Sequence, residues 1–212
     1  MSNSGRWSLA VLVVVVGLVV ALWPRDAEPD PTVQRTPPSS GVTSDTDLGP
    51  SRTAAALLQC PRPQPGSSPT SGPLDGITLS CLTDGTTVDL GAALAGTPTL
   101  LNLWAYWCAP CADELPILQE YAERAKLSVN VLTVHSDTNE EMALARLADL
   151  AVRLPGVQDA ALRVRTAVGA PPVLPVSVLL RADGSVAKVV VKPFTSVDEI
   201  ADVVAENLGV AA

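Results

Sequence analysis

The sequence is short of positive charge and almost without histidine. It has 14 Lys and Arg against 22 Asp and Glu, a net charge of −8, and no run of basic residues. A nucleic-acid-binding face needs clustered Lys or Arg, so a protein of this class is not expected. The single histidine, His135, cannot form a metal site by itself, and we expect it to be structural or exposed.

One segment is apolar and carries no charge: residues 7–23, WSLAVLVVVVGLVVALW. Its length is at the short end of the roughly 17–25 residues that span a bilayer as a helix. Arg6 precedes the segment and Arg25 follows it, a balance that favours a cytoplasmic N-terminus. We therefore predict an uncleaved signal anchor over residues 1–23 of a single-pass membrane protein, with the rest of the chain extracytoplasmic. The alternative is a signal peptide cleaved after Ala21, although no clear pair of small residues stands before that point.

The next stretch, residues 24–53, is dominated by Pro, Ser, Thr and Asp and has almost nothing that could bury a face. This composition predicts a disordered tether, whose root-mean-square reach is roughly 30 Å. The folded domain is expected to cover residues 54–212. A second cluster of Pro, Gly and Ser, residues 61–73, predicts a long surface loop near its start.

The remainder alternates between patterns typical of strands and of helices. Residues 99–104 form a nearly continuous apolar run, as in a strand covered on both faces. Further strands are expected at residues 129–134, 176–180 and 185–191, and helices at residues 115–125, 139–152 and 196–208. An Asp-Gly turn joins the last two strands, and a capping box opens the last helix. This order predicts an α/β fold with a mixed central sheet flanked by helices.

Two cysteines, Cys108 and Cys111, lie between the apolar strand and the helix that follows it. Two intervening residues at a helix N-terminus let a disulfide close without unwinding the first turn. Free amides and the positive end of the helix dipole stabilise a thiolate on the first, more exposed cysteine. We predict that Cys108 is the attacking nucleophile and that Cys111 resolves the mixed disulfide, without a cofactor or a metal.

The other two cysteines, Cys60 and Cys81, could in principle complete a zinc site of four cysteines. They stand 21 positions apart rather than as a second close pair, and export favours disulfides over zinc thiolates. We predict a structural disulfide between them, worth roughly 3 kcal/mol in the chain-entropy model. A second redox pair that recharges Cys108 and Cys111 is the alternative.

Two stretches resemble a known family: LLNLWAYWCAPCADELPIL (100–118) and LPVSVLLRADG (174–184). They are similar to the thioredoxin-like proteins and, within them, to the membrane-anchored TlpA/ResA-like disulfide reductases. Residues 74–90 resemble the leading hairpin of that family less closely. The resemblance covers about residues 74–212 and implies a thioredoxin-like fold and a thiol–disulfide oxidoreductase.

The resemblance also implies roles for single residues. Pro175 matches the family's cis-proline, which lies against the active disulfide and shapes the groove for a substrate strand. Pro171 and Pro172 compete for this role, but only Pro175 is followed by a strand and an Asp-Gly hairpin. Substrate contacts are expected at Trp107, Ala109, Pro110 and Leu174.

An acid at the place of Glu114 is found in ResA-like reductases, where it lies near the disulfide. A partly buried carboxylate there would relay protons to Cys111. The alternative is an ordinary first-turn glutamate favoured by the helix dipole. Cytosolic thioredoxins instead bury an Asp six residues before the first cysteine; this place is Asn102 here, which we expect to be structural.

The family's activity implies a reductase that keeps the cysteines of exported proteins, such as apocytochrome c, reduced during cytochrome c maturation. Its electrons would come from a membrane thiol-electron carrier of the CcdA/DsbD type. Two alternatives stay open: an oxidase that forms disulfides in secreted proteins, and a non-catalytic binding module with a thioredoxin fold. The pair Ala109-Pro110 does not decide the direction, because the reduction potential depends on thiolate stability.

Overall fold

The computed structural model describes residues 48–64, 71–126 and 128–210, all within one unit of the chain, Thr43–Ala212. The predicted signal anchor, residues 1–23, and the tether up to residue 47 lie outside these residues. Within the described part, no helix combines the length and the apolar character needed to cross a membrane.

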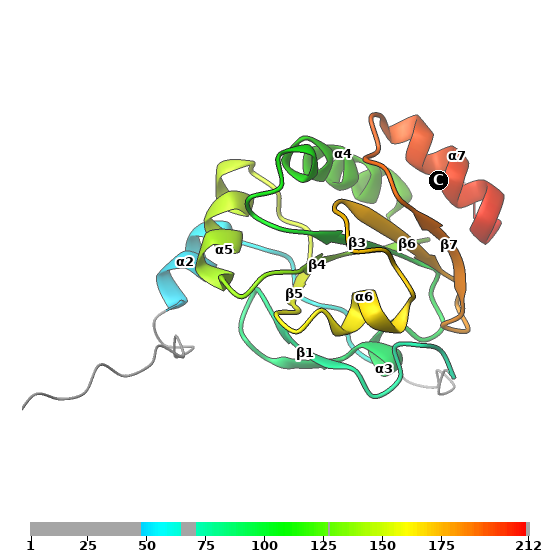
Figure 1. The fold of residues 1–212 in the computed structure, drawn as a ribbon, viewed down its shortest axis with the longest axis horizontal. Coiled ribbons are helices and arrows are strands. Elements are labelled where there is room, and N and C mark those ends of the chain that lie inside the picture. The colour runs from blue at the N-terminus through cyan, green and yellow to red at the C-terminus, as the bar shows by residue number, and fades with distance from the viewer. Residues whose placement is uncertain (1–47, 65–70, 127, 211–212) are drawn as a thin grey trace, which may run out of the picture. The chain divides into compact units, whose positions relative to one another are not determined.

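A mixed sheet of seven strands, in the order β2-β1-β5-β4-β3-β6-β7, forms the centre of the fold (Figure 1). The strands are β1 (Thr78–Cys81), β2 (Thr87–Asp89), β3 (Thr99–Trp104), β4 (Asn130–His135), β5 (Gly156–Gln158), β6 (Val176–Leu180) and β7 (Val186–Val190). Strands β3, β4 and β5 are parallel to one another, and the other pairings are antiparallel.

Six helices accompany the sheet in the described residues. They are α2 (Gly49–Ala55), α3 (Leu90–Leu94), α4 (Ala109–Ala125), α5 (Glu140–Asp149), α6 (Arg163–Ala167) and α7 (Val197–Leu208). Buried residues of α2, α4, α5 and α7 belong to one core cluster, and buried residues of α3 and α6 belong to a second. Figure 1 shows α4 and α7 on one side of the sheet and α3 and α6 on the other. The predicted α/β fold with helices on both faces is therefore confirmed.

The central strand β3 explains how one sheet serves two cores. All of its residues are buried, as its continuous apolar run predicted. Because successive side chains of a strand point to opposite faces, Leu100 and Trp104 join the cluster of α4, while Leu101 and Leu103 join the cluster of α3 and α6. Helix α4 starts five residues after β3 ends, so any side chain of the connecting loop lies at the carboxyl end of this strand.

Several strands and turns predicted from local sequence patterns agree with the structure. Strand β6 has the predicted bounds, and β4 lies one residue further along the chain than expected. The Asp-Gly turn leads into β7, and the hairpin expected within residues 74–90 is formed by β1 and β2. The short elements α2, α3, β5 and α6 were not predicted from the sequence.

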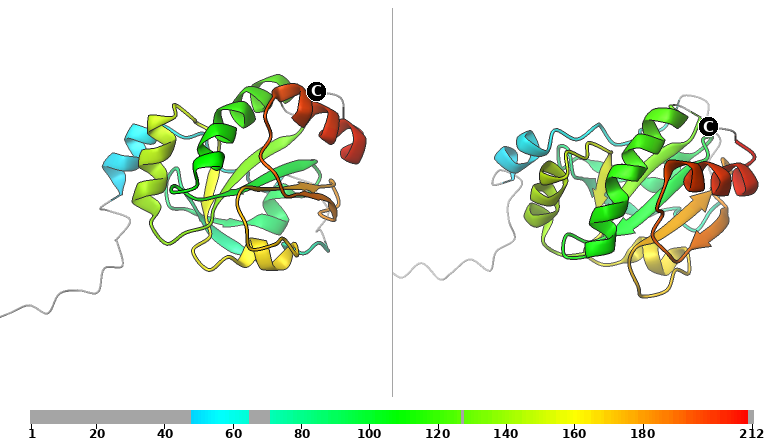
Figure 2. Two further views of the ribbon diagram at one scale, coloured as in Figure 1. Left: turned by 45° about the horizontal axis from the view of Figure 1, so that its top comes forward. Right: turned by 90° about the horizontal axis from the view of Figure 1, so that it is seen from above.

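Helix α2 corrects the boundary between the expected tether and the folded domain. Residues 48–53 were placed in the tether, but α2 packs against α5, as both views of Figure 2 show. Leu48 and Ala55 are buried, and Arg52 forms an ion pair with Glu140 at 3.0 Å. A helix of this length is stable only through such tertiary packing, which its local sequence does not reveal. The folded part thus extends at least to Leu48.

The cap of α7 leads to a prediction about stability. Ser196 Oγ accepts a hydrogen bond from the backbone N–H of Glu199 at 3.2 Å, as the capping box predicted. The Glu199 carboxylate accepts from Thr195 N rather than from Ser196 N. We expect Ser196→Ala to lower the free energy of unfolding by about 1 kcal/mol, measured by urea denaturation. Ser196→Gly is the matched control and should cost only a few tenths of a kcal/mol; equal losses would contradict a capping role.

Candidate functional site

Cys108 and Cys111 form a disulfide at the first turn of α4, with a Cα–Cα distance of 5.3 Å. Cys108 is the N-cap residue, in an extended conformation, and Pro110 in the first turn has the fixed φ that suits a helix start. The Cys108 Sγ accepts a hydrogen bond from the Cys111 N–H at 3.3 Å. Cys108 is 5% exposed and Cys111 is fully buried, so a reagent from solution reaches Cys108 first.

The peptide bond between Leu174 and Pro175 is cis, directly before β6. Strand β6 runs antiparallel to β3 with Val176 opposite Leu103. Pro175 is therefore level with the end of β3 from which the chain continues to Cys108. Pro175 is buried, and Leu174 is half-buried at the contact between the two core clusters.

An exposed apolar surface borders the disulfide. Trp107 is 59% exposed, and its indole Nε1 donates a hydrogen bond to Asp137 Oδ2 at 3.0 Å. Burial raises the pKa of Asp137, but hydrogen bonds from Trp107 and from backbone N–H groups outweigh it and hold the pKa below its usual value. Ala109 and Pro110 are exposed on the other side of Cys108. The indole held by Asp137 and the exposed Ala109 and Pro110 thus form an apolar surface that flanks Cys108 in the chain.

A buried carboxyl group, Glu114, lies behind the disulfide. Its side chain is fully buried; Oε2 accepts from Asn102 Nδ2 at 2.8 Å and Oε1 accepts from Phe194 N at 2.9 Å. Asn102 also donates to Ser177 Oγ at 3.2 Å, across the β3–β6 pairing. Because residues three apart on a helix are neighbours, about 5–6 Å between Cβ atoms, Glu114 lies next to Cys111. This buried position does not fit the alternative of an ordinary first-turn glutamate.

The protonation state of Glu114 is shifted by its surroundings. Burial raises the pKa of this carboxyl, and the hydrogen bonds from Phe194 and Asn102 only partly oppose the shift. A protonated Glu114 needs an acceptor for its proton. Asn102 Oδ1 has no hydrogen-bond partner within the described residues, so a rotation of the Asn102 amide would supply that acceptor. The cluster can thus accommodate both the charged and the neutral carboxyl.

A family model described as Redoxin matches residues 68–205, more than half of the chain. The chain belongs to the Redoxin family. It is similar to the thiol:disulfide interchange protein CycY of Rhizobium leguminosarum bv. viciae, with 38% identity over 73 residues, 34% of each chain. It is also similar to the thiol-disulfide oxidoreductase ResA of Halalkalibacterium halodurans, with 32% identity over 98 residues, 45% of this chain and 54% of that protein. The Redoxin chain therefore spans between a third and about half of the length of these two curated relatives.

A solved structure gives the same picture of the fold. The secreted disulfide oxidoreductase of Mycobacterium tuberculosis, homologous to E. coli DsbE, matches with a TM-score of 0.53 and 26% identity, over 61% of this chain and 95% of that one. The mixed sheet of this Redoxin and its helices on both faces are accordingly thioredoxin-like, as the sequence resemblance implied.

Glu114 makes the stability of this Redoxin depend on pH. Since the pKa is raised in the folded state, the native protein keeps the proton over a range in which the unfolded chain has lost it. The free energy of unfolding contributed by Glu114 therefore falls as the pH rises from about 4.5, the ordinary pKa, through the raised pKa of the folded state.

We expect Glu114→Gln to remove this decline in stability, measured as the urea midpoint between pH 4.5 and pH 8. Glu120→Gln, an exposed site on the same helix, is the control and should leave the decline in place; an unchanged slope in Glu114→Gln would contradict the assignment.

His135 is structural, one of the two alternatives expected for it, whereas the hydrogen bonds of Arg146 and Asp137 to the loop before Cys108 were not predicted from the sequence. His135 is fully buried, with Nδ1 2.8 Å from Gln158 Oε1 and its ring 5.0 Å from that of Trp104. Burial lowers the pKa of His135, and the hydrogen bond to Gln158 only partly opposes it. Arg146 of α5 donates to the carbonyl of Tyr106 at 3.1 Å. One signal was present: Asp137 follows β4 by two residues, and parallel neighbours β3 and β4 end at the same edge of the sheet.

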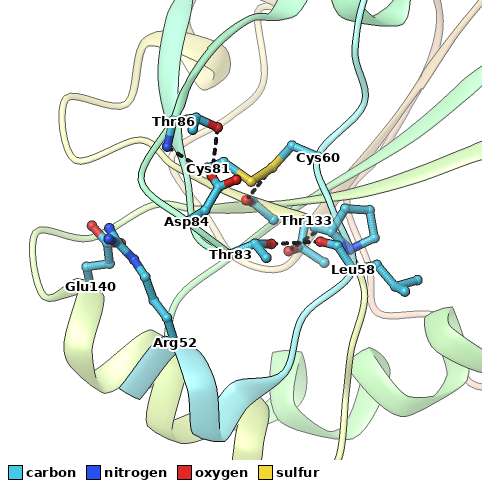
Figure 3. The surroundings of a disulfide bond; sticks show 11 residues. Arg52, Leu58, Cys60, Cys81, Thr83, Asp84, Thr86, Thr133 and Glu140 are labelled. Carbon is cyan, nitrogen blue, oxygen red and sulfur yellow. Dashed lines mark hydrogen bonds and ion pairs between the residues drawn. A yellow bond between two sulfur atoms is a disulfide. The ribbon is translucent and has the colours of Figure 1, made fainter. Parts of the chain in front are cut away.

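Cys60 and Cys81 form the other disulfide, with a Cα–Cα distance of 6.0 Å (Figure 3). Both residues are buried in the core cluster of α3 and α6, whereas Cys108 and Cys111 belong to the cluster of α4. The four sulfurs therefore do not converge on one zinc site. The two disulfides belong to different core clusters, and whether Cys60–Cys81 is structural or redox-active is tested by the variants described in the Discussion.

Proposed function

We propose that this Redoxin is a thiol–disulfide oxidoreductase that works through Cys108 and Cys111. The observation that carries the proposal is the disulfide at the N-terminus of α4, in which Cys108 keeps 5% exposure and Cys111 is fully buried. The exposed Trp107 directly precedes Cys108, and Pro175 lies level with the end of β3 from which the chain continues to Cys108. A non-catalytic binding module would not need its cysteine pair at a helix N-terminus, where a thiolate is stabilised.

The first step depends on the thiolate of Cys108. When the disulfide is reduced, the N–H of Cys111 and the positive end of the α4 dipole favour a negative charge on Cys108 Sγ. This thiolate attacks one sulfur of a substrate disulfide; a mixed disulfide forms and the other substrate sulfur leaves as a thiolate. Cys111 then attacks Cys108 Sγ, which releases the second substrate thiolate and closes the Cys108–Cys111 disulfide. The substrate gains two electrons and takes up two protons, and the enzyme is oxidised.

Glu114 supplies the proton transfer in this scheme. The Cys111 thiol must lose its proton before it attacks, and the neighbouring carboxylate is the base that accepts it. In the reverse direction, a protonated Glu114 returns the proton as the enzyme disulfide opens. The raised pKa of Glu114 and the free acceptor on Asn102 support a group that cycles between both states. Asn102 and Ser177 act by positioning this carboxyl.

Substrate recognition uses the exposed surface beside the disulfide. An extended peptide would lie against Trp107, Ala109 and Pro110 and would pair with the backbone of Leu174. Main-chain pairing fits many sequences, which suits an enzyme that acts on several partners. The β3–β6 pairing begins at Val176, so Leu174 lies before the paired part of β6.

The direction favoured is reduction of disulfides in exported proteins, with apocytochrome c among the clients and a membrane thiol-electron carrier of the CcdA/DsbD type as the electron source. The similarity to ResA and CycY supports this choice, together with the predicted signal anchor at residues 1–23. The tether would then connect the bilayer to a catalytic domain outside the cytoplasm. The competing function is an oxidase of secreted proteins.

The reduction potential of Cys108–Cys111 separates these two functions. The full-length protein is equilibrated with glutathione and dithiothreitol buffers, the free thiols are alkylated, and peptide masses report each cysteine pair separately. A reductase should have a potential near or below about −270 mV, the value of thioredoxin. A value towards about −120 mV would identify a disulfide-forming enzyme instead.

A further inference from the structure

A cavity of about 490 Å³ lies at the far end of α4 from the disulfide. Its lining comes from the last turns of α4, from residues 129–131 at the start of β4, and from the extended segment 58–64. Helix α4 has 17 residues, so its two ends are about 25 Å apart. The cavity is therefore separate from the redox site, and its volume lies within the roughly 300–1,000 Å³ of small-molecule sites.

The floor of the cavity is apolar. It is formed by side chains that are almost completely buried in the protein: Ala93, Val129, Val131 and Leu154. At the mouth, Leu58 is 61% exposed, although it is a large apolar residue. Water is a poor occupant of this apolar part of the lining, and the polar side chains of Gln59, Thr97, Gln119 and Asn130 lie elsewhere in the lining.

The rim of the cavity has the opposite character. Three exposed cations stand around it, Arg62, Lys126 and Arg153, against one exposed acid, Glu123. This local excess of positive charge occurs in a chain whose net charge is −8. A cationic rim over an apolar floor complements a molecule with an anionic head and an apolar body.

The wall of the cavity is fixed before any ligand arrives. Leu58 N donates to Arg153 O at 2.8 Å, and Leu58 O accepts from Thr83 Oγ1 at 2.7 Å (Figure 3). Two residues later, the disulfide from Cys60 to Cys81 ties the same segment to β1. A wall held at two nearby points costs little ordering entropy when a ligand binds.

We propose that this cavity binds a free single-chain amphipathic anion, with its chain against the apolar floor and its carboxylate between Arg62 and Arg153. A guanidinium group meets a carboxylate in a bidentate geometry that an amine cannot match, so the two arginines are the specific contacts and Lys126 adds charge. The inference rests on the cavity alone and does not depend on the redox function of Cys108.

Photolabelling with a diazirine analogue of decanoate tests the site. Full-length protein in phosphatidylcholine nanodiscs is labelled, and modified peptides are located by mass spectrometry. We expect saturable labelling within residues 58–64 and 119–126, displaced by decanoate but not by the uncharged 1-decanol. Arg62→Gln with Arg153→Gln should raise the decanoate concentration for half-displacement about fivefold to tenfold, since each exposed charge pair contributes modestly.

The matched control removes two positive charges elsewhere, by Arg165→Gln on α6 with Lys188→Gln on β7, and should label as the unmodified protein does. Loss of labelling in both double variants would show a response to net charge, not to the rim. Labelling that does not saturate, that falls outside the cavity, or that is the same in Arg62→Gln with Arg153→Gln would overturn the proposal.

Discussion

Replacing Cys108 by serine should reduce disulfide exchange to the uncatalysed background, a loss of at least about 10³-fold on the scale seen when other enzymes lose their nucleophile. The reason is that Cys108 is the more exposed residue of the pair, at 5% against full burial of Cys111. A serine hydroxyl at the same place is not ionised by a helix dipole at neutral pH and cannot form a mixed disulfide. The measurement is reduction of a fluorescent dipeptide disulfide under single-turnover conditions.

Cys111→Ser is the informative companion. It keeps the attacking thiolate but removes the group that resolves the intermediate, so a stable adduct with glutathione should accumulate on Cys108. Intact mass reports this adduct, and circular dichroism confirms that both variants are folded. Appreciable turnover by folded Cys108→Ser would contradict the proposed mechanism. An adduct on Cys60 or Cys81 would show that the other cysteine pair is the reactive one.

Removing the other disulfide should cost stability rather than activity. We expect Cys60→Ala with Cys81→Ala to lower the free energy of unfolding by about 3 kcal/mol and the Tm by about 10 °C, because the bond closes a loop of 21 positions. Leu58 and Thr83 would still hold part of the segment, so the chain should fold. Thermal unfolding and the single-turnover assay are measured on the same preparation.

These two measurements distinguish the two hypotheses for Cys60–Cys81, a structural disulfide and a second redox pair. A structural bond predicts a large stability loss with exchange at Cys108 unchanged at temperatures well below the Tm. A second redox pair that recharges Cys108 and Cys111 predicts the reverse, with multiple turnovers lost in a protein of nearly normal stability. Cys108→Ala with Cys111→Ala, which removes the shorter loop, is the control for the loss of a disulfide as such.

Whether an element could be predicted from the sequence depends on how far apart along the chain its interacting residues are. Strands β3 and β6 could be predicted from their own apolar runs. The start of α4 could be predicted from Cys108 and Pro110. Helix α2 could not, because its stability comes from α5, with Arg52 and Glu140 separated by 88 positions. Burial of Arg52 and Ala55 cannot be inferred from the seven residues of this helix alone.

The candidate site divides in the same way. The cysteine pair and Pro175 belong to compact motifs, so they could be assigned without a structure. The groups that tune them are distant in sequence: Trp107 and Asp137 are 30 positions apart, and Asn102 and Ser177 are 75. Glu114 could be named by resemblance, but its complete burial and its bond to Phe194 N depend on the chain folding back from beyond β7.

The placement of the two disulfides on opposite faces of the sheet has a consequence for how the protein loses activity over many turnovers. Under the proposed mechanism Cys108–Cys111 opens and closes in every cycle, whereas Cys60–Cys81, which belongs to the other core cluster, stays closed. In the proposed catalyst, one disulfide is redox-active and the other is structural. Under the proposed mechanism Cys108 is the sulfur that becomes a thiolate in every cycle, so over-oxidation of Cys108 is expected to limit how long the protein stays active.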